Sequence, residues 1–319
     1  MIFVGGTGRS GTTILAKILG KHPDIYVFPK EIRFITDPDG VLSLKSALVD
    51  NWSFFQADFA IERFFKLLHV LSKSNIGKYP SVNLKNIAGK KFYSDWKNSY
   101  FNEISQFSFK SAWIARASLF RKAFLQFFRK NRFTEFFLKK SFYASPMTEE
   151  KFYYVTNRFL SEFFNHVAGL HDKKIVVEHT PSNFLHADSL FKMFPEMKLV
   201  HIFRDPRDVV TSYHMQDWGS KDIRLNIRWI SDVLNQWESI KKKIPGHSFY
   251  ELKFENLIDN FQSNLKKLCD FLNIQFHVSL LDTDISRHNI GRWKKELCEE
   301  EIKHIHNNYK FLLDRYGYK

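Results

Sequence analysis

The first twenty residues change from an apolar run to a glycine-rich segment and then to an amphipathic stretch. Residues 2–6 are apolar and short enough for a buried strand. In Thr12–Leu19 the apolar side chains recur on one helical face, and Gly20 follows as a typical helix end. The pattern predicts a strand, a glycine loop and a helix in succession.

Further strands and helices alternate along the rest of the chain. The predicted strands are residues 25–28, 174–177, 199–203 and 248–253. Apolar residues between and after them recur at helical spacing, as in Ile227, Ile230, Leu234 and Trp237. Alternation of this kind is typical of a parallel sheet covered by helices on both faces. We therefore predict an α/β fold with three layers, α/β/α, around a central parallel sheet.

Residues 41–169 show little strand pattern, and we interpret them as a large helical insert within one domain that spans residues 1–319. Residues 110–140 combine many Lys and Arg with a single acid, Glu135. Apolar residues at helical spacing there predict a basic helix, carried by Phe120, Phe124, Phe127 and Phe128. Such a helix binds an anionic membrane surface or an acidic polymer, or packs with a solvated basic face.

Residues 6–13, Gly-Thr-Gly-Arg-Ser-Gly-Thr-Thr, lie between the first predicted strand and helix. Backbone amides of such a loop and the following helix N-terminus cradle a phosphate. The glycine spacing matches the P-loop pattern GxxxxGK[ST], but Thr12 replaces the lysine that reaches the β/γ-phosphates of ATP. The loop therefore suits a donor without a γ-phosphate. Its candidate ligand-binding residues are Gly8, Arg9, Ser10, Gly11, Thr12 and Thr13.

A second candidate anion site follows the predicted strand 199–203. Arg204 leaves this strand at its carboxyl end, where ligands bind in open α/β sheets. Ser212 comes eight residues later, about two turns along a helix that begins after Pro206. Both side chains are expected to reach one phosphate beside the glycine loop.

These two motifs, in this order, resemble those of the P-loop sulfotransferases that use 3′-phosphoadenosine 5′-phosphosulfate (PAPS), closest to the glycan and tyrosine-protein sulfotransferases. Residues 8–13 resemble the 5′-phosphosulfate loop of that family, and Arg204 with Ser212 resembles its 3′-phosphate motif. A third segment resembles the family's C-terminal nucleotide-covering motif, Gly291, Arg292, Trp293 and Lys294. The resemblance covers residues 1–35 and 174–310. It implies PAPS as donor, PAP as product and no metal.

The resemblance also implies a catalytic base. Lys30-Glu31-Ile32-Arg33 follows the strand 25–28 and resembles the Glu-containing segment of glycan sulfotransferases, so Glu31 is the candidate general base. Lys30 and Arg33 are candidate substrate-binding residues. Relatives usually carry Lys where this chain has His179, which would act as imidazolium, donate one N–H while neutral, or be a structural histidine at a strand end. Arg9 is the alternative cation for the leaving group.

The amino-acid composition limits the kinds of ligand and partner that we expect. The net charge of +14 favours anionic ligands such as a nucleotide, an acidic glycan or anionic lipid. Cys269 and Cys298 lie far apart and predict neither a disulfide framework nor a zinc site. The residues after Met1 lack a signal-peptide pattern. We expect a cytoplasmic protein, with peripheral membrane contact or a removed N-terminal anchor left open.

The prediction is thus a sulfotransferase that acts on a hydroxyl or amine. A carbohydrate or glycoconjugate is slightly favoured as the acceptor, and an acidic glycan or a lipid-linked molecule fits the same chemistry. One alternative is an ATP-dependent P-loop phosphotransferase, which Thr12 and the Arg204–Ser212 pair disfavour. The other is a non-enzymatic basic protein that binds nucleic acid or membranes. It accounts for the charge but not for Glu31, Arg204 and Arg292 together, so no nucleic-acid partner is expected.

Overall fold

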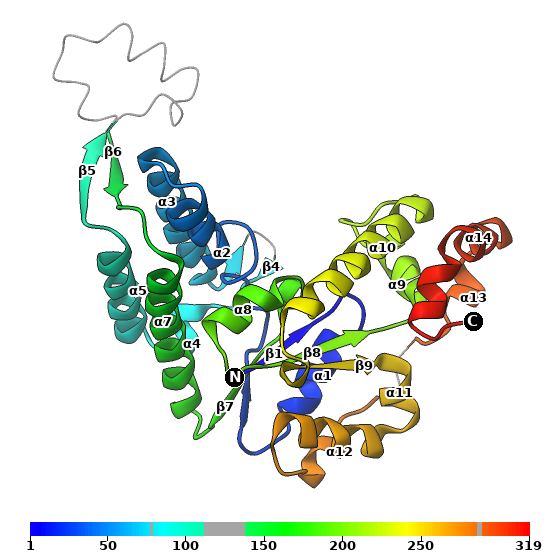
Figure 1. Ribbon diagram of the computed structural model, residues 1–319. Helices are drawn as coiled ribbons and strands as arrows, with labels where there is room; N and C mark the ends of the chain where they lie inside the picture. The colour runs from blue at the N-terminus through cyan, green and yellow to red at the C-terminus, as the bar shows by residue number, and fades with distance from the viewer. Residues whose placement is uncertain (77–78, 112–137, 286–288) are drawn as a thin grey trace, which may run out of the picture.

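The computed structural model describes residues 1–76, 79–111, 138–285 and 289–319 (Figure 1). Within these residues a five-stranded parallel sheet has the order β2-β7-β1-β8-β9. Its strands are β1 (Ile2–Gly5), β2 (Ile25–Val27), β7 (Ile175–Glu178), β8 (Lys198–Phe203) and β9 (Phe249–Lys253). Because all of them run in one direction, their carboxyl ends share one edge of the sheet.

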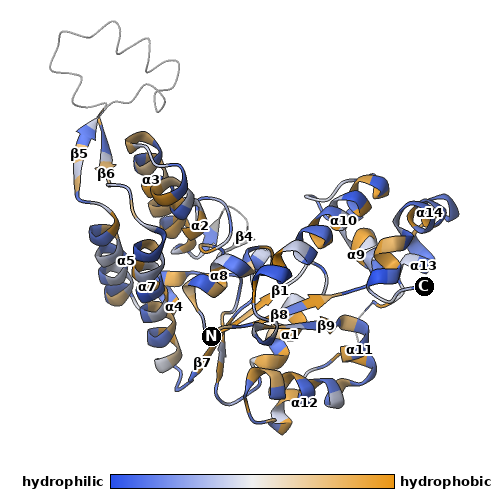
Figure 2. Cartoon of the chain, viewed as in Figure 1, coloured by the Kyte–Doolittle hydropathy of each residue, from blue (hydrophilic) through white to orange (hydrophobic). Residues whose placement is uncertain are grey.

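Helices cover both faces of this sheet. Ile2 and Val4 point to one face and pack with α1, α11 and α12, whereas Phe3 points to the opposite face, towards α7 and α8. Figure 2 shows hydrophobic residues concentrated in the buried strands β1 and β8. The helices named here are α1 (Thr12–Leu19), α7 (Glu149–Gly169), α8 (Ala187–Met193), α10 (Ile223–Ile240), α11 (Phe254–Asp259) and α12 (Phe261–Leu272). The predicted three-layer α/β/α architecture is confirmed.

The stretch 41–169 is largely helical, but it also contains two short antiparallel hairpins that its sequence pattern does not predict. Its helices are α2 (Val41–Lys45), the π-helix η1 (Ser46–Asp50), α3 (Phe54–Leu71), α4 (Leu84–Ala88), α5 (Lys90–Ile104) and α7. Its strands are β3 (Asn75–Ile76), β4 (Tyr79–Pro80), β5 (Phe107–Ser111) and β6 (Lys139–Tyr143). Most of β5 is exposed, so it lacks the apolar alternation that marks a half-buried strand. The helix predicted for residues 120–128 lies outside the described residues.

Aromatic packing joins this stretch to the sheet. Phe28, directly after β2, stacks on Phe163 of α7 at 6.1 Å between ring centroids. The indole of Trp96 in α5 donates a hydrogen bond to the carbonyl of Phe159 in α7 at 2.7 Å. All of these side chains belong to one buried cluster that also contains Phe3 of β1. The insert therefore positions the end of β2 through a continuous core.

The C-terminal helices lie on the other side of the molecule from the insert (Figure 1). They are α9 (Pro206–His214), α13 (Trp293–Glu296) and α14 (Glu299–Arg315), and they share a third core with α10. Short 3-10 turns complete the fold, η4 (Pro181–His186), η5 (Lys241–Lys243), η6 (Gly246–Ser248) and η7 (Val278–Leu281). In the described part of the chain, every helix is too short or too polar to cross a membrane.

Candidate functional site

The loop between β1 and α1 is shaped to hold an anion. Gly8 and Gly11 have φ angles of 71° and 110°, which favour glycine. A Cβ at Gly11 would lie 2.6 Å from the ring of Phe254, so a larger residue would clash. The N-terminal amides of α1 follow directly and attract negative charge. The hydroxyl of fully buried Ser10 has no partner among the described residues, which leaves a donor for a ligand oxygen.

The glycine loop contacts the helix after β8. The Nε atom of Arg9 donates a hydrogen bond to the Ser212 hydroxyl at 2.9 Å. The neighbouring Tyr213 donates its hydroxyl proton to the carbonyl of Thr7. The structure thus places residues of the two predicted phosphate motifs in direct contact, although they lie 203 positions apart in the chain.

Arg204 leaves β8 at the same edge of the sheet. Its Nη2 atom donates to a carboxylate oxygen of Asp208 at 3.1 Å and to the carbonyl of Asn289. Its buried Nε has no partner in the described part of the chain. The guanidinium is therefore held in place through Nη2 while its buried Nε donor is unused, which leaves a donor for a phosphate oxygen.

The C-terminal motif folds against Arg204 through Asp208. The fully buried carboxylate of Asp208 accepts hydrogen bonds from the backbone amides of Gly291 at 2.8 Å and Trp293 at 3.1 Å. Arg292 instead pairs with Glu296 at 2.8 Å, and the Lys294 ammonium lies 5.7 Å from the centroid of the Trp293 ring. The segment is near the predicted donor site, but the Arg292 guanidinium is engaged elsewhere.

The motif around Arg204 divides into two functions. Arg207 is buried and forms ion-paired hydrogen bonds with Asp205 at 2.8 to 3.2 Å. It also donates to the carbonyl of Lys319 at 2.7 Å and lies 4.0 Å from the centroid of the Trp293 ring. Arg207 therefore fastens the C-terminus to α9, whereas Arg204 faces the site.

Glu31 lies in the loop after β2, two strands away from β1 in the sheet. Its side chain is half-buried, and desolvation raises the pKa of the carboxyl above its ordinary value. The Arg33 guanidinium, 3.9 Å from the carboxylate, acts in the opposite direction. Lys30 precedes Glu31 and is partly exposed. A carboxylate with a raised pKa is a better proton acceptor, which suits a general base.

A buried carboxylate supports this loop. Glu178, at the end of β7, is fully buried and accepts hydrogen bonds from the Thr180 hydroxyl at 2.6 Å, the Thr180 amide at 2.9 Å and the Ile32 amide at 3.4 Å. Thr180 Oγ1 in turn accepts from the Arg33 amide at 3.4 Å. The Asn183 amide bonds both Glu178 and the Val4 carbonyl. Glu178 therefore ties the loop that carries Glu31 to the end of β1.

His179 lies between Glu178 and this turn, with only 4% of its surface exposed. Burial lowers the pKa of its imidazole to about 4, so the side chain is neutral near pH 7. Its Nδ1 atom has no partner among the described residues. The structure therefore favours a neutral imidazole over an imidazolium at His179.

The candidates fall into two groups. On the β8 side, Arg9 bonds Ser212, and Arg204 bonds the segment 289–293 directly and through Asp208. On the β2–β7 side, Glu31 and His179 form no hydrogen bond with Arg9 or with each other in the described residues. Sequence reasoning gave no role to Asp208, Tyr213 or Glu178. The only available signal was the helical i, i+4 spacing of Arg204 and Asp208.

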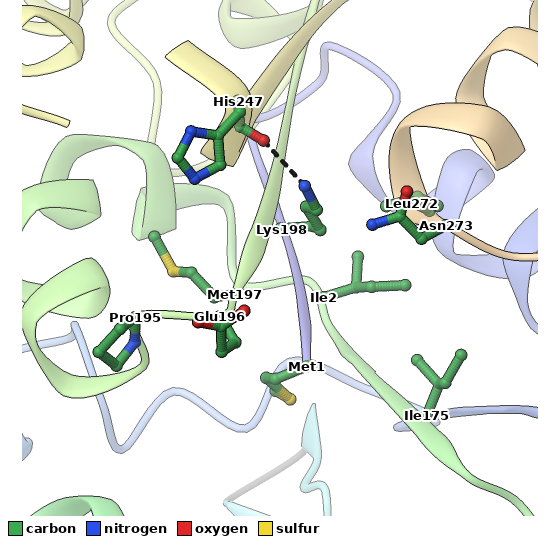
Figure 3. A pocket seen from close by; sticks show the side chains of 10 residues that line it. All are labelled: Met1, Ile2, Ile175, Pro195, Glu196, Met197, Lys198, His247, Leu272 and Asn273. Atoms are coloured by element: carbon green, nitrogen blue, oxygen red, sulfur yellow. Dashed lines mark hydrogen bonds between the residues drawn. The ribbon is translucent and has the colours of Figure 1, made fainter. Parts of the chain in front are cut away.

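The opposite edge of the sheet has a different character. A hollow of about 180 Å³ lies there, near the first residues of the strands, Ile2, Ile175 and Lys198 (Figure 3). The Lys198 ammonium points to the carbonyl of His247 and donates a hydrogen bond of 2.9 Å. None of the candidate catalytic residues lines this hollow.

The sulfotransferase family model matches residues 2–278, and the chain belongs to this family. A sulfotransferase domain from the curacin biosynthetic pathway superimposes with a TM-score of 0.51 at 14% identity, covering 100% of this chain and 98% of that one. This likeness shows a shared fold. The chain is therefore a member of the sulfotransferase family with the P-loop α/β fold.

Curated relatives are similar over shorter stretches. An omega-hydroxy-beta-dihydromenaquinone-9 sulfotransferase of Mycobacterium bovis is 22% identical over 163 residues, 46% of this chain and 42% of the relative. An uncharacterized protein of Aquifex aeolicus is 27% identical over 115 residues, 34% of this chain and 15% of the relative. The chain thus matches less than half the length of either relative.

Proposed function

We propose that the protein transfers the sulfuryl group of PAPS to a hydroxyl, or amine, of an acceptor. The observation that carries this proposal is the contact between Arg9 of the lysine-free glycine loop and Ser212 beside Arg204. Two anion sites side by side match a donor with both a 5′-phosphosulfate and a 3′-phosphate. ATP has no 3′-phosphate, so it would leave Arg204 without a ligand.

The residues present fit PAPS. The amides of residues 8–13 and the unpartnered Ser10 hydroxyl would hold the 5′-phosphosulfate, and Arg204 and Ser212 would hold the 3′-phosphate. Arg9 would stabilise the charge that develops on the leaving phosphate. The segment 291–294 would cover the nucleotide from the side of Asp208.

In the proposed reaction an acceptor oxygen forms a bond to sulfur while the bond from sulfur to the 5′-phosphate oxygen breaks. Glu31 takes the acceptor proton, and PAP leaves with the charge. His179 would donate an N–H to a sulfuryl oxygen. A sulfuryl group carries less charge than a phosphoryl group, so we expect transfer without a metal.

We propose a carbohydrate or glycoconjugate as acceptor. The mycobacterial relative is named for a hydroxylated menaquinone, which makes a lipid alcohol the second candidate. This relative is similar to the chain over less than half of either sequence, so the acceptor named for the relative cannot be assigned to this protein directly.

Calorimetric titration with PAP and with ADP, each with and without Mg²⁺, tests the donor. We expect tight, metal-independent binding of PAP and weak binding of ADP. Preference for ADP with Mg²⁺ would refute the proposal and would indicate a phosphotransferase.

A further inference from the structure

A large groove runs beside the candidate site, between helix α1 and the edge strand β2. Its volume is about 790 Å³, within the range of small-molecule and oligosaccharide sites. Most of the side chains that line it are polar or charged. They come from α1 (Thr13, Lys17, Lys21), from β2 and the residues after it (Tyr26, Phe28, Pro29), from residues 171–179 (His171, Lys173, His179) and from residues 282–284 (Asp282, Thr283, Asp284).

Two buried polar atoms of the lining have no partner in the described residues. They are Nδ1 of His179 and the hydroxyl oxygen of Thr283, which come from opposite parts of the chain. A buried polar atom without a hydrogen bond costs free energy, and a ligand that supplies the bond recovers it. Both atoms therefore point to a polar ligand in this groove.

The order of the strands places the groove on the side from which an acceptor must approach. The residues proposed to hold the leaving nucleotide, Arg9, Arg204 and Ser212, lie on the β8 side of β1. Glu31 and His179 follow β2 and β7, on the opposite side of β1. In an in-line transfer the attacking oxygen comes from the side opposite to the leaving group. The groove reaches His179 from that side.

We propose that this groove binds a carbohydrate chain of the acceptor, with its acidic groups paired to Lys17 and Lys21. The inference rests on the proposed function and adds the surface that binds the acceptor and the acidic groups that the surface recognises. Lys17 and Lys21 are exposed and form no ion pair in the described part of the chain.

The remaining lining matches the same ligand. Tyr26, stacked on His171 at 4.9 Å, supplies an aromatic surface for a sugar ring, and Asp282 and Thr283 supply hydrogen-bond partners for hydroxyls.

The test is titration of the PAP-saturated protein with an unsulfated hexasaccharide of alternating hexuronate and N-acetylhexosamine. The variant K17E/K21E reverses both charges of the groove. The matched control K242E/K243E makes the same change at two exposed lysines that precede β9, at the other edge of the sheet. We expect binding to the wild type, about tenfold or more weakening in K17E/K21E, and little change in the control.

Thr283→Val provides a second variant that conserves volume and removes only the hydroxyl. It should weaken the hexasaccharide about fivefold and leave PAP binding unchanged. If the wild-type protein binds PAP but not the hexasaccharide, or if K17E/K21E binds it normally, the groove proposal is overturned. If PAP itself does not bind, the proposed function fails instead, so the two failures are distinguishable.

Discussion

The donor side and the acceptor side of the site are held in place very differently. On the donor side, Arg204 and the amides of Gly291 and Trp293 all converge on the fully buried carboxylate of Asp208. On the acceptor side, the backbone of the loop that carries Glu31 is tied to the turn after β7 by two long hydrogen bonds of 3.4 Å. In the first arrangement the protein groups are preorganised for one anionic ligand. The second holds the loop through its backbone and the buried side chain of Ile32, and leaves the Glu31 carboxylate without a hydrogen bond to Glu178 or Thr180.

This contrast has a chemical reason. The donor nucleotide has fixed phosphate positions, and rigid donors aimed at them lose little entropy on binding. An acceptor contributes only one reacting oxygen to the sulfuryl transfer. Its binding surface can therefore be built from a separate part of the chain, and the proposed groove is lined by α1, β2, residues 171–179 and residues 282–284.

The largest expected effect separates binding from turnover. Glu31→Gln should reduce sulfuryl transfer from radiolabelled PAPS by ~10²–10⁴, because the amide cannot accept the acceptor proton. Its affinity for PAP, measured by calorimetry, should not change. Glu196→Gln, at an exposed carboxylate beside the opposite edge of the sheet, is the control and should remain active. Normal turnover in Glu31→Gln would place the base elsewhere.

The next effect belongs to the donor side. Arg204→Ala should weaken PAP by ~30-fold or more, because it removes a buried charged partner of the 3′-phosphate. ADP, which lacks that phosphate, should bind as it does to the wild type. Thermal unfolding checks that the loss of the bonds to Asp208 and Asn289 has not unfolded the protein. An unchanged affinity for PAP would remove Arg204 from the site.

A pH profile tests the acceptor side. Desolvation raises the pKa of Glu31, so the ionised base should be lost at a higher pH than for an exposed Glu. Below that pKa, kcat/KM should fall about tenfold per pH unit. Arg33→Gln should move this acid limb to still higher pH, since the Arg33 charge lowers the pKa of Glu31. A limb that stays in place would separate Glu31 from the titration.

The smallest effect concerns the support of the Glu31 loop. Thr180→Val removes a hydroxyl that bonds both Glu178 and the Arg33 amide, so it should cost ~1–2 kcal/mol of stability and speed hydrogen exchange of residues 30–33. Thr156→Val is the matched control, because this buried hydroxyl bonds Tyr100 in the insert. It should destabilise the protein without changing exchange in residues 30–33. Equal exchange in both variants would contradict the role of Thr180.

Local sequence patterns were sufficient to predict an element where all of its signals lie within the element and its flanking residues. The helix Thr12–Leu19 was predicted with its observed bounds, because its apolar spacing and the flanking glycines are all local signals. The strand 199–203 differs from β8 by one residue. The hairpins β3–β4 and β5–β6 were missed, since each short strand depends on a partner rather than on its own pattern.

Within the candidate site the same division holds. Gly8, Gly11, Arg204 and Glu31 could be selected from the sequence, because each follows a predicted strand. The role of Glu178 could not, since a buried carboxylate next to a strand end looks like any acidic residue until its hydrogen-bond donors are placed around it. Arg207 shows the converse, because only its hydrogen bonds to Asp205 and to the Lys319 carbonyl distinguish it from Arg204, the predicted anion-binding arginine three residues before it.

By itself, the sequence determined the alternation of strands and helices, the glycine loop without a lysine and the identity of the charged residues at the strand ends. These depend on neighbouring residues and their periodicity. Only the tertiary structure decided which of these ends lie side by side, with β1 between β7 and β8, and that a groove separates α1 from β2. Strand order and buried hydrogen bonds arise from contacts between residues far apart in the chain, and a local pattern carries no record of them.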